Sequence, residues 1–307
     1  MDCYHKPLVG GNVPPKLTLR ENYVNQDLGV MFCYNMSTFT GEEWATPNID
    51  PDTFAPTGLD IDQWLDAVVS AGGKYAILIT KHHDGFALWP TAYHVGGYAA
   101  YGIGVTAWYV ANGSPDIVGL FVTKCSARSL NPVLYYSTWD RTYEARVGAG
   151  YAAGYSAMVI AQLTELLTNY GNITALWFDG WTHPSIQPNV SVDAVWNLIQ
   201  SLQPNCLLIF NNTPYNYLSE IDIYEQTPAP TGNTRPAEVI YSMRADSTWF
   251  YNAASGQTSA YLKTAATINA AIQSANANGA VYCINVTPGT DGHLPAAQVT
   301  ILGELVP

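Results

Sequence analysis

The chain has 307 residues, of which 48% are hydrophobic and only 12% are charged, so it can bury one large core. Its 24 acidic residues against 12 basic ones give a net charge of −12, which argues against nucleic acids and anionic membrane surfaces as partners. An uncharged composition with 21 Tyr and 9 Trp is more typical of a secreted protein than of a cytosolic one, and it is compatible with a neutral carbohydrate as ligand.

Stretches that favour strands alternate with stretches of helical periodicity along the chain. The predicted strands are residues 29–34, 75–80, 133–136, 173–178, 206–210, 221–224, 239–243 and 280–286. The predicted helices are residues 61–71, 116–128, 152–169, 192–202 and 259–276, the second of them with Ser114 as N-cap and Pro115 in its first turn. Eight strands with helices between most of them predict an α/β fold, a single-domain (β/α)8 barrel of the TIM type. We expect it to be irregular around strands five to seven, where the helix after the sixth strand is missing or replaced by a Pro-rich loop at 227–236.

The barrel is expected to comprise residues 24–307, with residues 1–23 as an N-terminal extension that packs on it. The first residues lack the apolar core of a signal peptide, so if the protein is secreted, its signal is absent from this sequence. No segment is long and apolar enough to span a bilayer. No pattern in the sequence indicates an oligomeric state.

Cysteines and glycosylation sequons give only weak indications of the compartment. The five cysteines, an odd number without metal-type spacing, are Cys3, Cys33, Cys125, Cys206 and Cys283, so at least one is free or pairs between chains. The Asn-x-Ser/Thr sequons begin at Asn35, Asn112, Asn172, Asn189, Asn211 and Asn285. Three of them, at Asn35, Asn211 and Asn285, lie at strand ends, where a glycan would clash with the barrel.

Polar residues cluster where the predicted strands end. They are Asn35, His82-His83-Asp84, Tyr136-Ser137, Asp179, Asn211-Asn212 and Glu225, at or just beyond the ends of six strands. In a (β/α)8 barrel the C-terminal strand ends share one face and carry the catalytic groups. This face is therefore the predicted site.

Asp179 is the most informative of these residues. It ends an apolar strand in the segment Ala-Leu-Trp-Phe-Asp-Gly-Trp at 175–181, between Trp177 and Trp181. A carboxylate beside aromatic faces that can cover the apolar face of a pyranose ring is a common way to build a sugar site. The alternative is an Asp that only caps the following segment.

Glycoside hydrolysis needs a second carboxyl beside Asp179. Glu225 ends the sixth predicted strand and faces the same mouth, which makes an approach to the 5–5.5 Å of a retaining enzyme feasible. Glu238 competes for the acid/base role, but it precedes its strand and should sit at the opposite end of the barrel. Weaker candidates, in loops without a fixed direction, are Asp84, Glu42 and Glu43.

His82 and His83 could indicate a metal site, but neighbouring residues on a strand point to opposite faces and no third His or Cys has suitable spacing. We favour hydrogen bonding to sugar hydroxyls, with Asp84 orienting one imidazole, over histidines that merely hold the loop. The tryptophans Trp44, Trp89, Trp177 and Trp181 are either core residues or, since several neighbour these polar groups, the wall of a site.

At these segments the chain resembles glycoside hydrolase family 29, the retaining α-L-fucosidases. The matching segments are residues 74–89 with His-His-Asp-Gly, 133–137, 163–181 with Trp-Phe-Asp-Gly, 202–204 and 284–295. The resemblance implies Asp179 as nucleophile and contacts from His82, His83, Tyr136 and Trp177 to the fucose. We further place Trp44 and Asn35 among the substrate-binding residues. Both Glu225 and Glu238 match glutamates considered for the acid/base in the family, and we assign Glu225.

The chain departs from the family pattern in two contacts and at its end. Relatives often carry a His where this chain has Cys33-Tyr34-Asn35, and an Arg after the Asn pair where it has Thr213. Many relatives also carry a C-terminal β-sandwich, whereas this sequence ends at Pro307 soon after the last strand, so we expect the catalytic domain alone or nearly so.

The resemblance implies a retaining exo-α-L-fucosidase that acts on terminal α-L-fucose of oligosaccharides or glycans, with no cofactor and no metal. Two alternatives stay open: a fucose-binding barrel that has lost activity, and a metal-dependent barrel hydrolase that uses the His pair.

Overall fold

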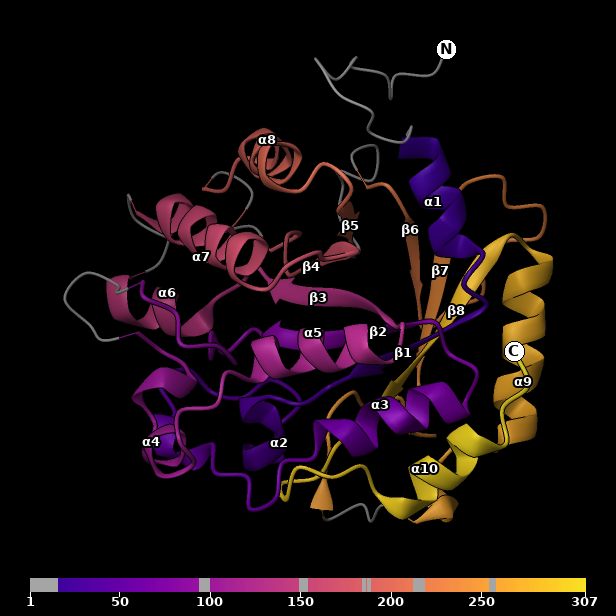
Figure 1. The fold of residues 1–307 in the computed structure, drawn as a ribbon, viewed down its shortest axis with the longest axis horizontal. Coiled ribbons are helices and arrows are strands. Elements are labelled where there is room, and N and C mark those ends of the chain that lie inside the picture. The colour runs from indigo at the N-terminus through magenta and orange to yellow at the C-terminus, as the bar shows by residue number, and fades with distance from the viewer. Residues whose placement is uncertain are drawn as a thin grey trace.

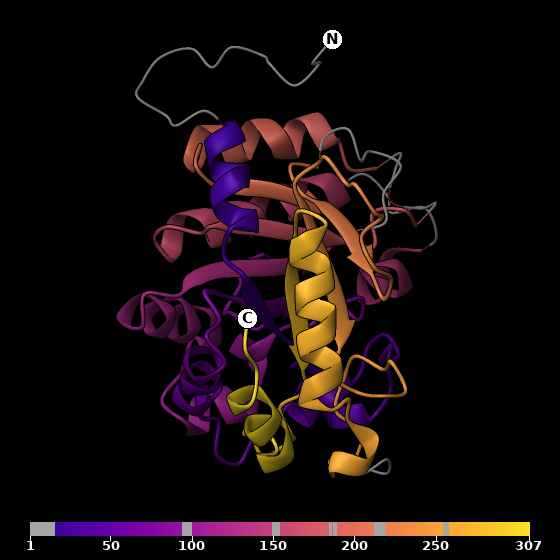
Figure 2. The same cartoon turned by 90° about the vertical axis from the view of Figure 1, so that its right-hand side faces the viewer.

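The computed structural model describes residues 16–93, 100–148, 154–183, 186, 189–211, 219–253 and 258–307. Eight parallel strands form one sheet in the order β5-β4-β3-β2-β1-β8-β7-β6. They are β1 (Leu28–Phe32), β2 (Tyr75–Lys81), β3 (Asn131–Ser137), β4 (Ala175–Asp179), β5 (Leu207–Phe210), β6 (Asp222–Glu225), β7 (Ala237–Ser242) and β8 (Ala280–Val286). The sheet curls into a nearly closed barrel with the helices outside it (Figures 1 and 2), and the predicted (β/α)8 fold is confirmed.

The helices are α1 (Lys16–Val24), α2 (Met36–Thr40), α3 (Ile61–Ser70), α4 (Ala107–Ala111), α5 (Ile117–Ala127), α6 (Arg141–Val147), α7 (Tyr155–Asn169), α8 (Val192–Leu202), α9 (Ala265–Ala277) and α10 (Ala296–Gly303). The prediction for residues 192–202 is confirmed to the residue, and α9 begins later than predicted, after a short turn at Ser259–Tyr261. The N-cap of α5 is Asp116, which accepts from the Gly119 N–H, and not Ser114. Residues 226–236 form turns and no helix, as the prolines there predicted.

Side chains alternate between two apolar layers, as the two-residue period of a strand requires. Tyr75, Ile77 and Ile79 of β2 point into the barrel, whereas Ala76 and Leu78 pack against the outer helices. In β3 the inward residues are Val133 and Tyr135, and the outward ones are Leu134 and Tyr136. This parity decides which side chains can reach a site inside the barrel mouth.

Among the described residues β5 and β6 form no strand ladder, and hydrogen bonds of Ser219 and Glu220, from side chain and backbone, close the barrel there. The Glu220 carboxylate accepts from the Leu208 N–H at 2.8 Å, and the Glu220 N–H donates to the Leu208 carbonyl at 2.8 Å. Ser219 Oγ accepts from the Phe210 N–H at 3.0 Å, and Lys16 of α1 lies 3.1 Å from Glu220. The irregularity predicted around the fifth to seventh strands is found at this junction, where hydrogen bonds of Ser219 and Glu220 replace a regular strand pairing.

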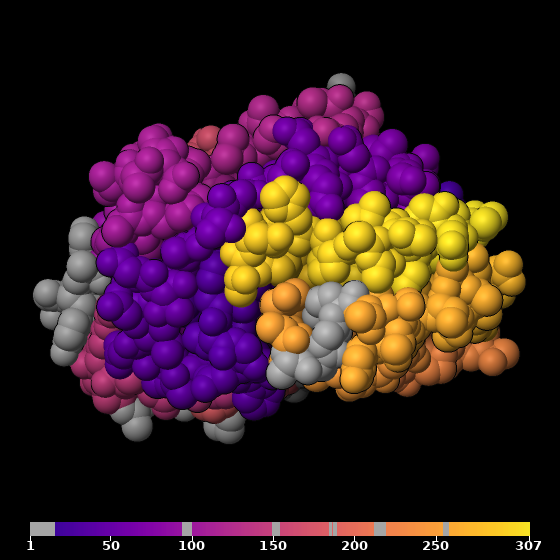
Figure 3. Space-filling model, turned by 90° about the horizontal axis from the view of Figure 1, so that it is seen from below, coloured from indigo at the N-terminus to yellow at the C-terminus, as the bar shows by residue number. Residues whose placement is uncertain are grey.

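The C-terminal residues close the circle against the first βα unit. Gln63 exchanges two hydrogen bonds with the backbone of Leu294, at 2.9 and 2.8 Å, and Trp64 Nε1 donates to the Gly292 carbonyl at 2.8 Å. Figure 3 shows the yellow C-terminal residues lying against the indigo and violet N-terminal ones. Within the described residues no helix is long and apolar enough to cross a membrane.

Candidate active site

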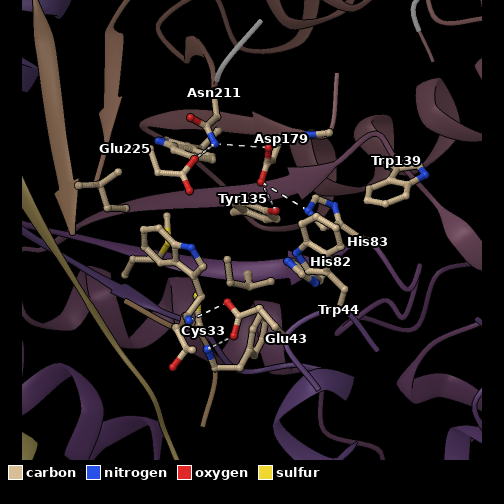
Figure 4. A pocket seen from close by; sticks show the side chains of 18 of the residues that line it. Cys33, Glu43, Trp44, His82, His83, Tyr135, Trp139, Asp179, Asn211 and Glu225 are labelled. Carbon is tan, nitrogen blue, oxygen red and sulfur yellow. Dashed lines mark hydrogen bonds and ion pairs between the residues drawn. The ribbon is translucent and has the colours of Figure 1, made fainter. Parts of the chain in front are cut away.

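A cavity of about 700 Å³ opens where the strands end. Its floor is the top of the barrel interior and is apolar, formed by Met31, Cys33, Ile79, Trp177 and Ile240. The walls carry most of the polar and aromatic groups, and Figure 4 shows those on which the site depends: Glu43, Trp44, His82, His83, Tyr135, Trp139, Asp179, Asn211 and Glu225. The strand ends thus converge on one space, as the sequence predicted.

Asp179 stands at the end of β4 with donors on both carboxylate oxygens. Tyr135 OH donates to Oδ2 at 2.8 Å, and the Gly180 N–H donates to Oδ1 at 2.7 Å. Gly180 has a φ of +71°, and a side chain there would meet Trp139 atoms at 2.6 Å, so the sharp turn after Asp179 requires glycine. With 24% of its side chain exposed, Asp179 is oriented and still open to the cavity.

Asn211 joins the two candidate catalytic carboxylates. Its Nδ2 donates to Glu225 Oε2 at 2.6 Å and lies 3.4 Å from Asp179 Oδ1. Because both contacts share one nitrogen, the two oxygens lie within about 6 Å of each other, near the separation of a retaining pair and below that of an inverting pair. The predicted approach of Glu225 to Asp179 is what the coordinates show (Figure 4).

The two histidines lie side by side on the same wall, with ring centroids 4.2 Å apart. His83 Nδ1 is 2.7 Å from Ser137 Oγ, and its Nε2 is 3.7 Å from Asp179 Oδ2. His82 Nδ1 is 3.9 Å from Asp84 Oδ2, too far for the predicted orienting hydrogen bond. Burial lowers the pKa of both imidazoles, so both are neutral at pH 7.

Glu43 and Trp44 follow α2 and form the wall opposite Asp179 (Figure 4). The Glu43 carboxylate accepts from the backbone N–H groups of Trp249 at 2.7 Å and Phe250 at 3.5 Å, and its burial raises its pKa. Trp44 is 56% exposed, and its ring meets the His83 ring edge-on at 5.9 Å. An exposed indole at the mouth of a cavity is a surface on which a sugar can stack.

The structure corrects two of the predicted substrate contacts. Tyr136 is fully buried on the outer side of β3, where it hydrogen-bonds to Lys81 Nζ and Gln162 and does not line the cavity. Asn35 is also fully buried, and it caps α2 and donates to the Phe86 carbonyl. Both residues were predicted to contact the substrate because polar residues that line the site lie near them in the sequence. The parity of β3 turns Tyr136 outward, and the N-cap geometry of α2 holds Asn35 away from the site.

Tyr135 takes the place predicted for Tyr136. It is in register with Trp177, two residues before the Ser137–Asp179 pair, so it shares the inward face with Asp179. Alternation along β4 reaches Trp177 from Asp179, and the β3–β4 register then leads from Trp177 to Tyr135. Glu43, Trp139 and the loop residues Trp249 and Phe250 come from segments without such a period, and they could not be placed in advance.

Three further candidate residues lie outside the cavity lining. Glu238 is the second residue of β7, at the predicted opposite end, and it is fully buried. Glu42 accepts from the Thr46 N–H at the surface, and Asp84 is buried beneath the histidines. Asn212 and Thr213 lie outside the described residues.

The described cysteines are not paired in disulfides. Four cysteines are buried free thiols, and they are Cys33, Cys125, Cys206 and Cys283. In the part of the chain that the structure describes, no three His, Cys, Asp or Glu side chains are grouped to hold a metal ion.

A parallel (β/α)8 barrel with two neighbouring carboxylates in an aromatic-walled cavity at its C-terminal face has the architecture of a glycoside hydrolase. The chain belongs to the α-L-fucosidase family, since the profile of the family Alpha-L-fucosidase matches residues 19–306. The resemblance to glycoside hydrolase family 29 is thereby confirmed.

Similar proteins agree with this membership. The chain is 27% identical to Alpha-L-fucosidase 1 of Arabidopsis thaliana over 297 residues, which cover 88% of this chain and 55% of that protein. It is 26% identical to Tissue alpha-L-fucosidase of Homo sapiens over 161 residues, which cover 50% of this chain and 29% of that protein. The chain therefore spans about half the length of the plant relative.

Solved structures share the fold. Alpha-L-fucosidase isoenzyme 1 from Paenibacillus thiaminolyticus superposes with a TM-score of 0.76 at 24% identity, covering 94% of this chain and 75% of that one. A glycoside hydrolase 29 family member from an unknown rumen bacterium gives a TM-score of 0.72 at 25% identity, covering 95% of this chain and 57% of that one.

Proposed function

We propose that the protein is a retaining exo-α-L-fucosidase that removes terminal α-L-fucose from oligosaccharides or glycans. The observation that carries the proposal is the bridge from Asn211 to both Asp179 and Glu225, which holds two carboxyl groups at a separation suited to double displacement. Membership of the α-L-fucosidase family supports fucose as the sugar that is released.

Asp179 is the proposed nucleophile. Its Oδ2 would attack the anomeric carbon while the glycosidic C–O bond breaks, giving a covalent glycosyl-enzyme. The hydrogen bonds from Tyr135 and Gly180 fix the carboxylate without closing off the cavity side. In the ground state these donors orient the attacking oxygen, which keeps the entropic cost of reaching the transition state small.

Glu225 is the proposed acid/base. It would protonate the leaving oxygen in the first step and then take a proton from the attacking water in the second. Its position on β6, across the Asn211 amide from Asp179, supports this role. Glu238 is not a suitable candidate, because its carboxylate is fully buried and outside the cavity lining.

The cavity floor supports a terminal sugar with an apolar edge. Met31, Ile79 and Ile240 present apolar surface suited to the C6 methyl group of fucose, beside the imidazoles of His82 and His83. The floor is closed by the barrel core, so a sugar that reaches Asp179 enters from the mouth, and this favours exo action.

The test is release of nitrophenol from an aryl α-L-fucoside by wild type, Asp179→Gly and Asp179→Asn, each with and without azide. We expect turnover by wild type, a loss of several orders of magnitude in both variants, and azide rescue of Asp179→Gly that yields a fucosyl azide. Asp193→Asn, on the exposed side of α8, is the matched control and should retain wild-type turnover.

Two other outcomes would redirect the proposal. Fucose binding by calorimetry without any turnover would identify a sugar-binding barrel. Turnover that a chelator abolishes, with stoichiometric metal in the purified protein, would identify a metal-dependent hydrolase.

We also propose that the protein acts outside the cell. The composition supports this, and the exposed Asn112 and Asn172 of two sequons could carry glycans, whereas the buried Asn35, Asn211 and Asn285 could not do so in the folded protein. Mass spectrometry of protein recovered from the culture medium of its source is the check. Recovery from the cell interior alone would contradict the proposal.

A further inference from the structure

His83 uses its two ring nitrogens for different neighbours. Nδ1 lies 2.7 Å from the hydroxyl of Ser137, the last residue of β3. Nε2 faces the cavity and lies 3.7 Å from Asp179 Oδ2. Only 6% of the residue is exposed, so these two neighbours decide which nitrogen carries the proton.

The hydrogen bonds of Ser137 favour one of the two tautomers. A hydroxyl has one hydrogen to donate and two lone pairs to accept. Ser137 Oγ donates to the Trp139 carbonyl at 2.9 Å and accepts from the Trp139 N–H at 3.1 Å. One lone pair is left for His83, and it can only accept. A Ser137 hydroxyl that donated to His83 Nδ1 instead would withdraw its hydrogen bond from the Trp139 carbonyl, so Nδ1–H is the tautomer that satisfies all three neighbours of this hydroxyl.

A neutral His83 with hydrogen on Nδ1 presents a lone pair at Nε2. This lone pair and Asp179 Oδ2 are then two acceptors 3.7 Å apart, which do not bond to each other. A donor that enters the cavity, such as a sugar hydroxyl, is the partner that Nε2 lacks.

We propose that Ser137 is a positioning residue that locks His83 in the Nδ1–H tautomer, so that His83 accepts a hydrogen bond from a substrate hydroxyl and does not donate to the nucleophile. The substrate part of this inference rests on the proposed function. The tautomer part rests on the hydrogen bonds alone.

The tautomer matters because the other one would present an N–H to the Asp179 carboxylate. An Nε2–H would point its partial positive charge at Oδ2 from 3.7 Å, stabilise the carboxylate before reaction and make it a weaker nucleophile. The same flip would remove the acceptor for the sugar hydroxyl. Both effects oppose the reaction, so the Nδ1–H tautomer preserves both the reactivity of Asp179 and the acceptor for the sugar hydroxyl.

The groups around His83 keep it neutral. Burial is the main cause of its lowered pKa, and the cationic Arg141 of α6 and the nearby His183 act in the same direction. The Asp179 carboxylate opposes them. His82 packs beside the ring and Trp44 covers its edge, so no other carboxylate contacts His83 among the described residues.

His82 offers the internal contrast. Its Nδ1 is buried without a hydrogen-bond partner, and Asp84 Oδ2, 3.9 Å away, is also unpartnered. Nothing in its surroundings fixes a tautomer in the way that Ser137 does for His83. The neighbouring histidine should therefore show no response to a change at Ser137.

The experiment is nitrogen NMR of protein labelled with ¹⁵N-histidine, in which the ring shifts report the tautomer. The chain has only 6 histidines, and the His83 signals are assigned by their loss in His83→Asn. We expect the Nδ1–H tautomer in wild type, a shift toward Nε2–H in Ser137→Ala, and restoration in Ser137→Thr. Turnover number should fall about tenfold in Ser137→Ala with a smaller change in KM, since about 1.4 kcal/mol of barrier corresponds to a factor of ten.

Ser219→Ala is the matched control. Ser219 is buried like Ser137, but the hydrogen bonds given for its hydroxyl are to backbone groups and not to a histidine. It should lower stability without moving the His83 signals. An Nε2–H tautomer or an imidazolium in wild type at neutral pH overturns the inference, as does an unchanged His83 in Ser137→Ala. A shifted tautomer with unchanged turnover overturns its catalytic part. If wild type proves inactive, the NMR result still decides the tautomer, so the two proposals fail separately.

Discussion

Two carboxylates inside the same barrel, Asp179 at its mouth and Glu238 at its closed end, receive similar hydrogen bonds and do different things. Glu238 accepts from Tyr23 and Tyr75, each at 2.7 Å, and from Trp177 Nε1 at 3.0 Å. Asp179 accepts from Tyr135, whose ring stacks on Trp177 at 5.3 Å. The Trp177 indole thus contacts both Glu238 and the tyrosine that binds Asp179.

Solvent access makes the difference between them. Glu238 is fully buried, and burial raises its pKa although its three donors act in the opposite direction. The three hydrogen bonds that its carboxylate accepts connect α1, β2 and β4 to β7. Asp179 keeps one side open to a cavity. Donors of the same kind therefore hold a buried structural carboxylate at one end of the barrel and the proposed nucleophile at the other.

The largest effect is expected from the partner of Asp179. Glu225→Ala should lower kcat/KM on a poor leaving group by about 10²–10⁴-fold, the usual contribution of general acid/base catalysis. The loss should be much smaller for nitrophenol, which leaves without protonation. Steady-state kinetics with both leaving groups is the measurement, and equal losses on the two substrates would remove Glu225 from the acid/base role.

The opposite pattern is expected at the closed end. Glu238→Ala leaves three buried donors unpaired, and at about 1–3 kcal/mol for each unsatisfied group the free energy of unfolding should fall by about 4 kcal/mol. The folded fraction should retain turnover within a few-fold. Urea unfolding followed by fluorescence, alongside the fucoside assay, checks both parts. A stable but inactive variant would give Glu238 a catalytic role.

Asp84 is a second fully buried carboxylate, and it has fewer hydrogen-bond donors than Glu238. Asp84 Oδ1 accepts from the Phe86 N–H at 2.7 Å, but its Oδ2 is buried without a partner. Burial raises its pKa to about 7; Asp140 adds to the rise, and Lys81 opposes it. An unfolded Asp titrates near 4, so between about pH 4 and pH 7 the folded chain holds a proton that the unfolded chain has released.

Folding should therefore become less favourable as the pH rises through this window, and no further above it. We expect the free energy of unfolding of wild type to fall by up to about 1.4 kcal/mol per pH unit relative to Asp84→Asn, which cannot ionise. Thermal melts of both proteins from pH 4 to pH 9 give the comparison. Parallel curves would show that Asp84 is ionised throughout.

The sequence predicted the barrel and the residues at its strand ends, because a parallel barrel places the C-terminal end of every strand at one face. It predicted Asp179, Glu225 and the histidines for that reason. It failed at Tyr136 and Asn35, where one step of strand parity or one helix cap turns a side chain out of the site. Glu43 comes from a loop, whose direction depends on tertiary contacts that no periodicity encodes.

The smallest and sharpest contrast is a matched pair of hydroxyl deletions. Tyr135→Phe and Tyr75→Phe each remove one hydrogen bond to a carboxylate, from Asp179 and from Glu238 respectively. Tyr75→Phe should cost about 1.5 kcal/mol of unfolding free energy, as expected for a buried bond to a charged group, and leave kcat unchanged. Tyr135→Phe should cost less stability, because water in the cavity can replace the hydroxyl, and should lower kcat about tenfold. Equal losses of stability without any loss of turnover would contradict this. The hydrogen bond from Tyr135 to Asp179 would then be structural, like the one from Tyr75 to Glu238, and would not orient a nucleophile.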